Sequence, residues 1–397
     1  MNSSFASNSE HLAKLGSQLP SIDIEKADGI YLYDEKGNEY IDIIAGIAVN
    51  NLGHNHPSII AAIKNQVEKN LHVMVFGEAL QKSQIELSNL LCSNLPEQLN
   101  NVYIVNSGSE AIEGTLKLAR RYTKRKEILS FQNAYHGSTY GALSIMGSTK
   151  YQKGFEPLVP EVDLLQINDT GDLNKISEKT ACVIIEPIQG EAGVVPAEVE
   201  YMQMLRKKCD ENGVLLAFDE VQTGMGRTGS LFAFEQYGVV PDILVLAKAL
   251  GGGMPIGAFV ASKKIMDSFQ SNPPLGHITT FGGHPVSCSA AIACLNVLTS
   301  SDIVSSVSSK GELFKQLLNH SAIKEVRGVG LMLAIEFSSA EFTQQVIDNC
   351  LKNGVLTDWF LFAENCIRIC PPLIITEEQI KDACSRIILS INQATNN

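Results

Sequence analysis

Residues 241–258 read PDILVLAKALGGGMPIGA, and this stretch decides the fold. Its apolar run at 243–247 is too short for most helices and lacks polar alternation, so it predicts a strand buried on both faces of a parallel sheet. Lys248 follows the run directly, and three glycines follow at 251–253. A lysine at a strand end is usually a solvated surface residue. Here, however, the glycines allow a ligand to approach closely, and a partly desolvated lysine can attack a carbonyl to form a Schiff base.

Similar apolar runs mark other strands in the middle of the chain, at 101–105, 182–186 and 214–219. Helical patterns such as the one at 110–126 separate them and suit crossover helices. This alternation predicts an α/β fold around a mostly parallel sheet. After about residue 300 the pattern changes to helix, strand and helix, which indicates a smaller C-terminal domain.

The bulk properties narrow the class of protein. A chain of 397 residues suits two packed domains. The formal charge of −12 argues against sequence-independent binding of nucleic acid. No apolar run of membrane-spanning length occurs, and the start of the chain lacks a secretion signal. Nine scattered cysteines without a CxxC pair predict a reducing, cytoplasmic environment.

Three further segments place polar residues where predicted strands end. Asp219 could be a turn cap, or it could pair with a protonated ring nitrogen. The turn at Ser107, Gly108 and Ser109 precedes a helical pattern, where backbone N–H groups favour an anion such as phosphate, although serine is also a common N-cap. Tyr135 could stack on a flat ring or belong to the core. Together with Lys248, these residues describe a pocket for pyridoxal phosphate (PLP).

The chain resembles the class III, fold-type I PLP aminotransferases, in particular the acetylornithine and ornithine branch, over nearly its whole length. Seven ordered motifs carry the resemblance, and the segment GIAVNNLGHNHP (46–57) also fits. The motifs are SGSEA (107–111), AYHG (134–137), EPIQGEAG (186–193), FDEVQTGMGRTG (218–229), PDILVLAKALGGGMPIGA (241–258), TTFGGHP (279–285) and IRICPPL (367–373).

The resemblance implies a large domain with a mostly parallel seven-stranded sheet flanked by helices. It also implies a smaller α+β domain formed from both ends of the chain. We therefore expect residues 1–50 to contribute to the small domain, 51–298 to form the PLP-binding domain, and 299–397 to complete the small domain. Residues 29–49 predict a hairpin with its turn at 36–38, and the first 20 residues are expected to pack loosely or against a partner.

Roles at the cofactor follow from the same resemblance. Lys248 would hold PLP covalently and then move the substrate proton, while Asp219 would hold the proton on the ring nitrogen. The family's active sites form across a homodimer interface, so Thr280 would reach the phosphate of the neighbouring subunit. The other cofactor contacts implied are Ser107, Gly108 and Ser109 at the phosphate, Tyr135 and Val221 on the ring faces, Gln222 at the phenolic oxygen, and His136 and Glu186 beside the ring.

Roles at the substrate also follow. Arg368 matches an arginine that binds an α-carboxylate, which suits the planar guanidinium. Glu191 matches the glutamate that masks this arginine when a substrate presents a terminal amine; the plain alternative is a structural ion pair. Where the branch that uses glutamate and 2-oxoglutarate has arginine, this chain has Ser138, which lacks the charge for a second carboxylate. Either another basic residue substitutes, or the amino-acid pair differs from glutamate and 2-oxoglutarate. The resemblance predicts ping-pong transamination from an amine such as N-acetylornithine or ornithine to an oxo acid, with 2-oxoglutarate as the first candidate.

Other functions remain as alternatives. An ω-amino acid:pyruvate aminotransferase or an aminomutase would keep the cofactor, and a noncatalytic PLP-binding protein would use it differently. A dinucleotide-binding dehydrogenase is disfavoured because no G-x-G-x-x-G follows a first strand. His54 and His56 form an H-x-H pair, but no nearby ligand set completes a zinc site. We expect no metal there and a role in ordering a loop near the dimer interface.

Overall fold

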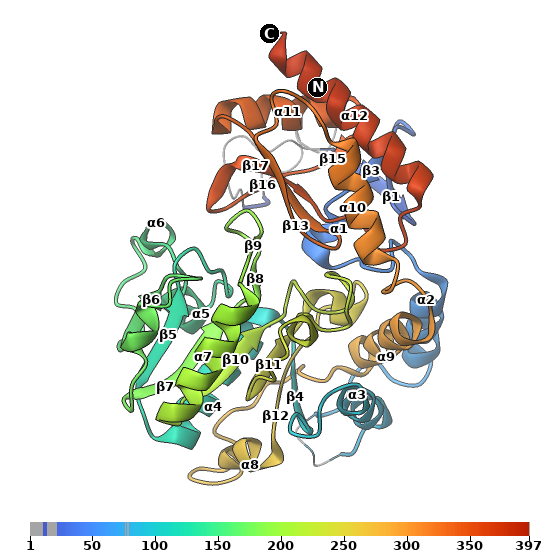
Figure 1. Ribbon diagram of the computed structural model, residues 1–397. Helices are drawn as coiled ribbons and strands as arrows, with labels where there is room; N and C mark the ends of the chain where they lie inside the picture. Colours follow the sequence, from blue (N-terminus) through green and yellow to red (C-terminus); the bar gives the residue numbers. More distant parts are fainter. Residues whose placement is uncertain (1–10, 14–21, 76, 78, 397) are drawn as a thin grey trace.

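A seven-stranded sheet forms the centre of the computed structural model, which describes residues 11–13, 22–75, 77 and 79–396 (Figure 1). Within it, β12 runs antiparallel to its neighbours β4 and β11 and the other pairs are parallel, so the predicted mostly parallel sheet is confirmed. The strand order is β4 (Asn101–Val105), β12 (Gly257–Ala261), β11 (Ile243–Leu246), β10 (Leu215–Asp219), β7 (Thr180–Ile185), β5 (Glu127–Phe131) and β6 (Val162–Leu165).

The apolar runs explain this sheet. Every residue of β7, β10, β11 and β12 is buried, because helices cover both faces and leave no polar side exposed. The predicted runs at 101–105, 182–186, 214–219 and 243–247 all contribute strands. Strands β5, β6 and β12 were not among those runs. Helices α3 (Lys82–Ser93), α4 (Gly108–Thr123) and α7 (Val199–Asn212) pack against strands of the sheet, while α2 (Pro57–Val67) and α9 (Pro285–Ser300) pack against each other and α9 also packs against α3.

A second lobe above this sheet joins the two ends of the chain (Figure 1). Its C-terminal sheet has the order β13 (Glu325–Val329), β14 (Met332–Glu336), β17 (Ala363–Ile369) and β16 (Trp359–Phe360). Its N-terminal sheet has the order β1 (Ile24–Asp28), β2 (Tyr31–Asp34), β3 (Glu39–Asp42) and β15 (Val355–Leu356). Three helices complete the lobe: α10 (Val307–Leu317), α11 (Ala340–Lys352) and α12 (Glu377–Thr395).

Strand β15 pairs in parallel with β3, with Val355 opposite Ile41. The N- and C-terminal segments therefore share one sheet, as a small domain built from both ends requires. The domain boundaries after residues 50 and 298 remain a prediction, and most of the first 20 residues lie outside the described part of the chain.

The predicted hairpin at 29–49 is shorter than expected. Strands β2 and β3 form it, with the turn between them at 35–38, but residues 45–48 form a left-handed turn instead of a strand. Ala45, Ile47 and Ala48 all have positive φ there, which is uncommon for residues with a side chain. Asp42 Oδ1 stabilises its start by accepting bonds from the backbone N–H groups of Ile44 and Ala45.

The two histidines of GHNHP have local structural contacts. His54 Nε2 lies 2.8 Å from Asp42 Oδ2, which ties the loop to β3. His56 precedes α2 and its Nδ1 accepts a bond from the N–H of Ser58. Among the described residues, no group of three or more His, Cys, Asp or Glu side chains could hold a metal ion. No helix in the described part of the chain is both long and apolar enough to span a bilayer.

Arg227 joins the two lobes through a fully buried guanidinium. Its Nη1 donates to the carbonyls of Leu331 at 2.9 Å and Pro371 at 2.5 Å, and its Nη2 donates to Asn51 Oδ1 at 2.5 Å. These acceptors come from three separate segments of the chain. Because a buried acceptor that loses its donor is costly, the side chain fixes the segments to one another.

Replacing Arg227 by Met should therefore lower the free energy of unfolding by about 2–4 kcal/mol, since three buried acceptors lose their donor. Urea denaturation of the apoprotein measures this. Arg120→Met is the matched control, because Arg120 also bonds two carbonyls, those of Lys126 and Pro160, but at the surface. It should cost less than about 1 kcal/mol. Equal losses in the two variants would contradict the role of Arg227.

Candidate active site

A cavity of about 440 Å³ lies at the carboxyl edge of the central sheet. In parallel sheets this edge is where ligands bind, because the strand ends and their loops meet there. Most residues predicted to contact the cofactor follow a strand that ends at this edge, and the fold brings them together around the cavity. The predicted residues among its lining are Ser107, Gly108, Ser109, Tyr135, His136, Glu186, Asp219, Val221, Gln222 and Lys248.

Lys248 follows β11 and begins the short 3₁₀ helix η4 (Lys248–Gly251). Its backbone has a φ of +47°, a left-handed conformation that a lysine rarely adopts. Burial lowers the pKa of its amine; the negative charge of Glu191 opposes this shift, and the positive charge of Arg368 adds to it. A lowered pKa increases the neutral fraction of the amine, which is the nucleophilic form. Among the described residues that line the cavity, Lys248 provides the only lysine or arginine side chain.

Asp219 ends β10, and its carboxylate is almost completely buried. Its Oδ2 lies 2.6 Å from His136 Nδ1, and its Oδ1 accepts a bond from the N–H of Val221 at 3.0 Å. The other ring nitrogen of His136 lies 3.2 Å from Ser130 Oγ. Burial lowers the pKa of His136, but its hydrogen bond to Asp219 and the charge of that carboxylate outweigh burial and raise it. His136 therefore orients the carboxylate of Asp219.

Glu186 follows β7 and lies beside the cavity. It accepts bonds from the N–H groups of Tyr135 at 3.1 Å and Gly190 at 3.2 Å. Burial raises the pKa of its carboxyl to about 7; the charge of His136 opposes this shift and that of Asp219 adds to it. Glu186 thus positions the backbone of the loop that carries Tyr135.

The turn at residues 107–109 begins the 16-residue helix α4. Ser107 Oγ caps the helix by accepting a bond from the N–H of Glu110. Glu110 Oε2 accepts bonds from the backbone and the side chain of Asn106, both at 2.8 Å. The helix dipole and the free N–H groups of this first turn make it suitable for a phosphate group.

Arg368 lies next to the cavity on β17, and it is 2% exposed. Its Nη2 donates to both carboxylate oxygens of Glu191, at 3.0 and 3.1 Å. Its Nε donates to Asp358 Oδ1 at 2.9 Å, and its guanidinium lies 4.4 Å from the ring centroid of Phe360. Burial favours the neutral form, but Glu191 and Asp358 outweigh it and raise the pKa of Arg368.

Two predicted residues lie outside this arrangement. Ser138 is exposed, and its Oγ lies 3.2 Å from the hydroxyl of Tyr135. Thr280 is also exposed and does not line the cavity. Within one chain, therefore, Thr280 has no contact with the cavity, and Ser138 supplies a hydroxyl and no charge.

Sequence reasoning missed three residues that hold the predicted ones in place. Asn106 and Glu110 support the turn at 107–109, and the spacing of Ser107 and Glu110 is that of a capping box, so this signal was available. Asp358 binds Arg368 from ten residues earlier in the chain. No local pattern marks Asp358, because β16 and β17 first bring the two side chains together.

The arrangement fits PLP. A lysine with a lowered pKa suits its aldehyde, and a buried carboxylate held by His136 suits its protonated ring nitrogen. The first turn of α4 suits its phosphate. Half-buried Tyr135 and Val221 line the cavity and offer flat and apolar surfaces for the ring.

Comparison with known proteins gives consistent results. Residues 13–391 match the family model described as Aminotransferase class-III. The acetylornithine aminotransferase of Clostridium acetobutylicum is 44% identical over 376 residues, covering 91% of this chain and 94% of that protein. The acetylornithine aminotransferase of Caldanaerobacter subterraneus is 43% identical over 374 residues, covering 91% and 92%.

Solved structures agree with the fold. The crystal structure of the ornithine aminotransferase from Toxoplasma gondii superposes with a TM-score of 0.92 and 30% identity, covering 99% of this chain and 95% of that chain. A transaminase from the marine bacterium Virgibacillus superposes with a TM-score of 0.92 and 26% identity, covering 98% of both chains. The predicted fold class, that of the fold-type I PLP aminotransferases, is confirmed.

Gly137→Ala should weaken PLP binding, because Gly137 packs directly on the turn at 107–109. A Cβ there would lie 2.8 Å from Ser109 Cβ and 3.0 Å from its Cα, on a backbone with φ +122°. Overpacking of this kind displaces the neighbour, and we expect about tenfold weaker binding in PLP titrations of the apoprotein.

Gly154→Ala is the control for backbone strain. Gly154 also has a positive φ, +89°, but a Cβ added there would meet no atom within 4 Å. This variant should bind PLP like the original protein. Equal PLP affinities in the two variants would contradict a role for residues 107–109 in holding the phosphate.

Proposed function

The chain belongs to the class III aminotransferases, and we propose that it moves an amino group from a terminal amine, such as that of N-acetylornithine or ornithine, to an oxo acid. The observation that carries this proposal is the pair of Glu191 and Arg368, whose guanidinium lies 3.5 Å from Gln222 in the cavity lining. The names of the acetylornithine and ornithine aminotransferases among its relatives support the same substrate class.

The pair favours a terminal amine because it masks the charge of Arg368. A donor that reacts through its α-amino group places a carboxylate next to the reacting carbon, and that carboxylate needs a free guanidinium. With Glu191 bound to Nη2, a primary amine without an adjacent carboxylate fits better. Glu191 leaves when an oxo acid arrives, and the acceptor carboxylate takes its place.

The reaction follows a ping-pong order in this proposal, with the donor reacting first and the acceptor second. Bound PLP supplies an aldehyde for the amino group and a ring that withdraws electrons from the reacting carbon. Lys248 holds the cofactor and removes the proton from the substrate carbon, because its lowered pKa leaves the amine free to act as a base. Asp219, fixed by His136, keeps the ring nitrogen protonated.

The neutral side chain of Ser138 affects which oxo acid the site can accept. It is exposed and neutral, and no lysine or arginine other than Lys248 lines the cavity in the described part of the chain. An acceptor with one carboxylate, such as pyruvate, needs only Arg368. 2-Oxoglutarate needs a second cation for its far carboxylate, from a basic residue outside this lining or from a partner subunit.

The test of the proposed function is a set of half-reactions without acceptor. The yellow absorbance of the holoenzyme is recorded after adding ornithine, N-acetylornithine, N-succinylornithine, 4-aminobutyrate, β-alanine, glutamate or alanine. Loss of this absorbance should be fastest with a terminal-amine donor. The resulting enzyme is then mixed with pyruvate or 2-oxoglutarate to identify the acceptor. A holoenzyme that no donor bleaches would favour the aminomutase or the noncatalytic alternative.

Lys248→Ala tests the assignment of the base in the same assay. Removing a positioned proton-transfer group should slow bleaching by about 10²–10⁴-fold, while PLP can still bind noncovalently. Lys263→Ala is the control, because Lys263 lies on the surface in a salt bridge with Asp267. Normal bleaching by the Lys248 variant would overturn the assignment.

We also propose a homodimer in which Thr280 reaches the phosphate of the neighbouring subunit. Apolar side chains around it are exposed in the single chain: Leu275 is 62% exposed and Phe281 is 54% exposed. The ring of His72, from a segment that also exposes Leu71 and Leu80, lies 5.0 Å from the ring of Phe281. An apolar surface of this kind suits a protein interface.

Light scattering should therefore give twice the 43.1 kDa of one chain. Thr280→Val should leave this mass unchanged and weaken PLP binding about fivefold or more, because a hydrogen bond to a charged phosphate is lost. A fully active monomer would contradict the proposal.

A further inference from the structure

Arg368 binds two carboxylates on different nitrogen atoms. Asp358 Oδ1 accepts from Nε at 2.9 Å, and both oxygens of Glu191 accept from Nη2. The two carboxylates and one guanidinium carry a net formal charge of −1. A single carboxylate would suffice to neutralise the arginine, so the second one calls for a separate explanation.

The two carboxylates reach Arg368 from different parts of the molecule. Asp358 lies directly before β16, which pairs with the strand of Arg368, and the backbone N–H of Arg368 donates to the carbonyl of Asp358 at 2.9 Å. Thr357 Oγ1 also donates to the carbonyl of Arg368 at 2.7 Å. Glu191 instead comes from the hairpin of β8 (Ile188–Gln189) and β9 (Val195–Pro196), below the C-terminal sheet in Figure 1.

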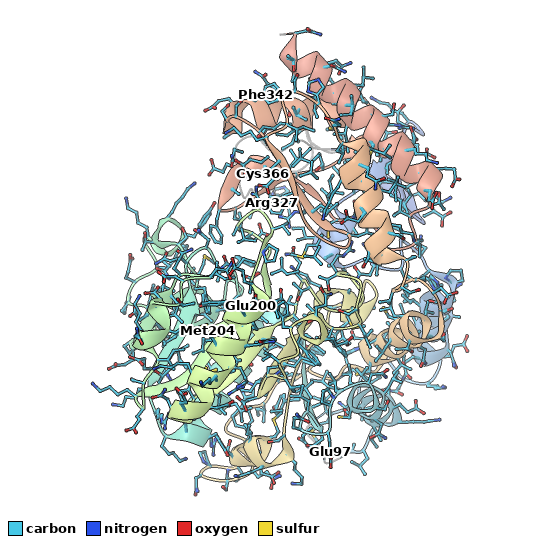
Figure 2. All side chains as sticks on the ribbon, in the orientation of Figure 1. Glu97, Glu200, Met204, Arg327, Phe342 and Cys366 are labelled. Atoms are coloured by element: carbon cyan, nitrogen blue, oxygen red, sulfur yellow. The ribbon has the colours of Figure 1, made fainter. Side chains whose placement is uncertain are left out.

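The hairpin meets the C-terminal sheet through contacts of its own. Arg327 Nε donates to the carbonyl of Gly193 at 2.7 Å, and Arg327 Nη2 lies 3.3 Å from Cys366 Sγ; Figure 2 labels both Arg327 and Cys366. The backbone N–H of Leu361 donates to Glu191 Oε2 at 3.1 Å. The backbone of Glu191 is held as well, since its carbonyl accepts from the N–H of Phe362 at 3.0 Å, so only its side chain would have to move to free Arg368.

A guanidinium can grip a carboxylate along two edges, the Nε–Nη2 edge and the Nη1–Nη2 edge. Asp358 occupies Nε and so blocks the first edge. The second edge points toward the cavity, because Nη1 lies 3.5 Å from Oε1 of Gln222, which lines that cavity. Phe360 supports one face of the guanidinium from 4.4 Å.

We propose that Asp358 is a positioning residue that holds Arg368 by Nε, so that the Nη1–Nη2 edge is presented to the carboxylate of the oxo-acid acceptor when Glu191 withdraws. This inference rests on the proposed function, because it requires an acceptor carboxylate at Arg368. Asp358 thereby determines specificity for the acceptor and takes no part in the half-reaction of a terminal amine.

Half-reactions of the holoenzyme test this separation. The enzyme is first converted with the best terminal-amine donor, freed of donor, and mixed with pyruvate or 2-oxoglutarate. Asp358→Ala should raise the apparent Kd for the oxo acid about tenfold, because the guanidinium loses its anchor, and should leave the donor half-reaction within about twofold. Asp358→Asn keeps an oxygen that can accept from Nε, so it should retain the affinity for the oxo acid.

Calorimetric binding of propionate and glutarate provides a readout independent of turnover. These compounds are unreactive analogues of pyruvate and 2-oxoglutarate. Asp358→Ala should lower the affinity for them by a similar factor, and Asp358→Asn should retain it. Glu364→Ala is the matched control, because Glu364 is an exposed carboxylate on the same strand pair that bonds to Lys150. It should change neither half-reaction.

Arg368→Lys separates failure of this inference from failure of the proposed function. If Arg368→Lys weakens the binding of the oxo acid while Asp358→Ala does not, the arginine binds the acceptor and the proposed role of Asp358 is wrong. If Arg368→Lys has no effect on the oxo acid, the proposed acceptor site itself is wrong. Equal losses of both half-reactions in Asp358→Ala would reveal a purely structural ion pair and would also overturn the inference.

Discussion

The buried charge of Arg368 is the constraint on which the site depends. A guanidinium removed from water must be compensated by partners of good geometry, or the fold loses several kcal/mol. Arg368 finds its partners in two lobes, with Asp358 directly before the neighbouring strand β16 and Glu191 in a hairpin of the other lobe. The charge pairing therefore sets where the C-terminal sheet lies relative to the cavity. Arg227 does the same for three other segments, with carbonyl and amide oxygens in place of carboxylates.

The parallel sheet supplies the second half of the site. Strands buried on both faces have no room for polar side chains, so polar residues appear where each strand ends. Because parallel strands end at one edge, Ser107, Asp219 and Lys248 meet there although more than 100 residues separate the first from the second. Burial on both faces makes the strands apolar, and it also confines the polar candidate site residues to the edge of the sheet where the cavity lies.

This connection explains what the sequence could predict. The apolar runs predicted four strands, and the polar residues at their ends predicted which side chains would line the cavity. Both predictions were possible because each depends on a local pattern in the sequence. The left-handed turn at 45–48 could not be predicted, since residues with a side chain, such as Ala45 and Ile47, favour other conformations. Asp358 was missed for a related reason. Its contact with Arg368 depends on the pairing of the adjacent strand β16 with β17. Pairing between strands is nonlocal, so no short sequence motif predicts it.

The pairing of carboxylates also explains how Lys248 keeps a lowered pKa among so many acids. Glu186, Glu191 and Asp219 each raise the pKa of the lysine by their charge, yet burial outweighs them. Their influence is limited because each already has partners: Asp219 binds His136, Glu191 binds Arg368, and Glu186 accepts two backbone bonds. A carboxylate engaged elsewhere offers Lys248 less stabilisation for its proton. Burial thus keeps the pKa of the lysine low, while the same ion pairs orient the groups around it.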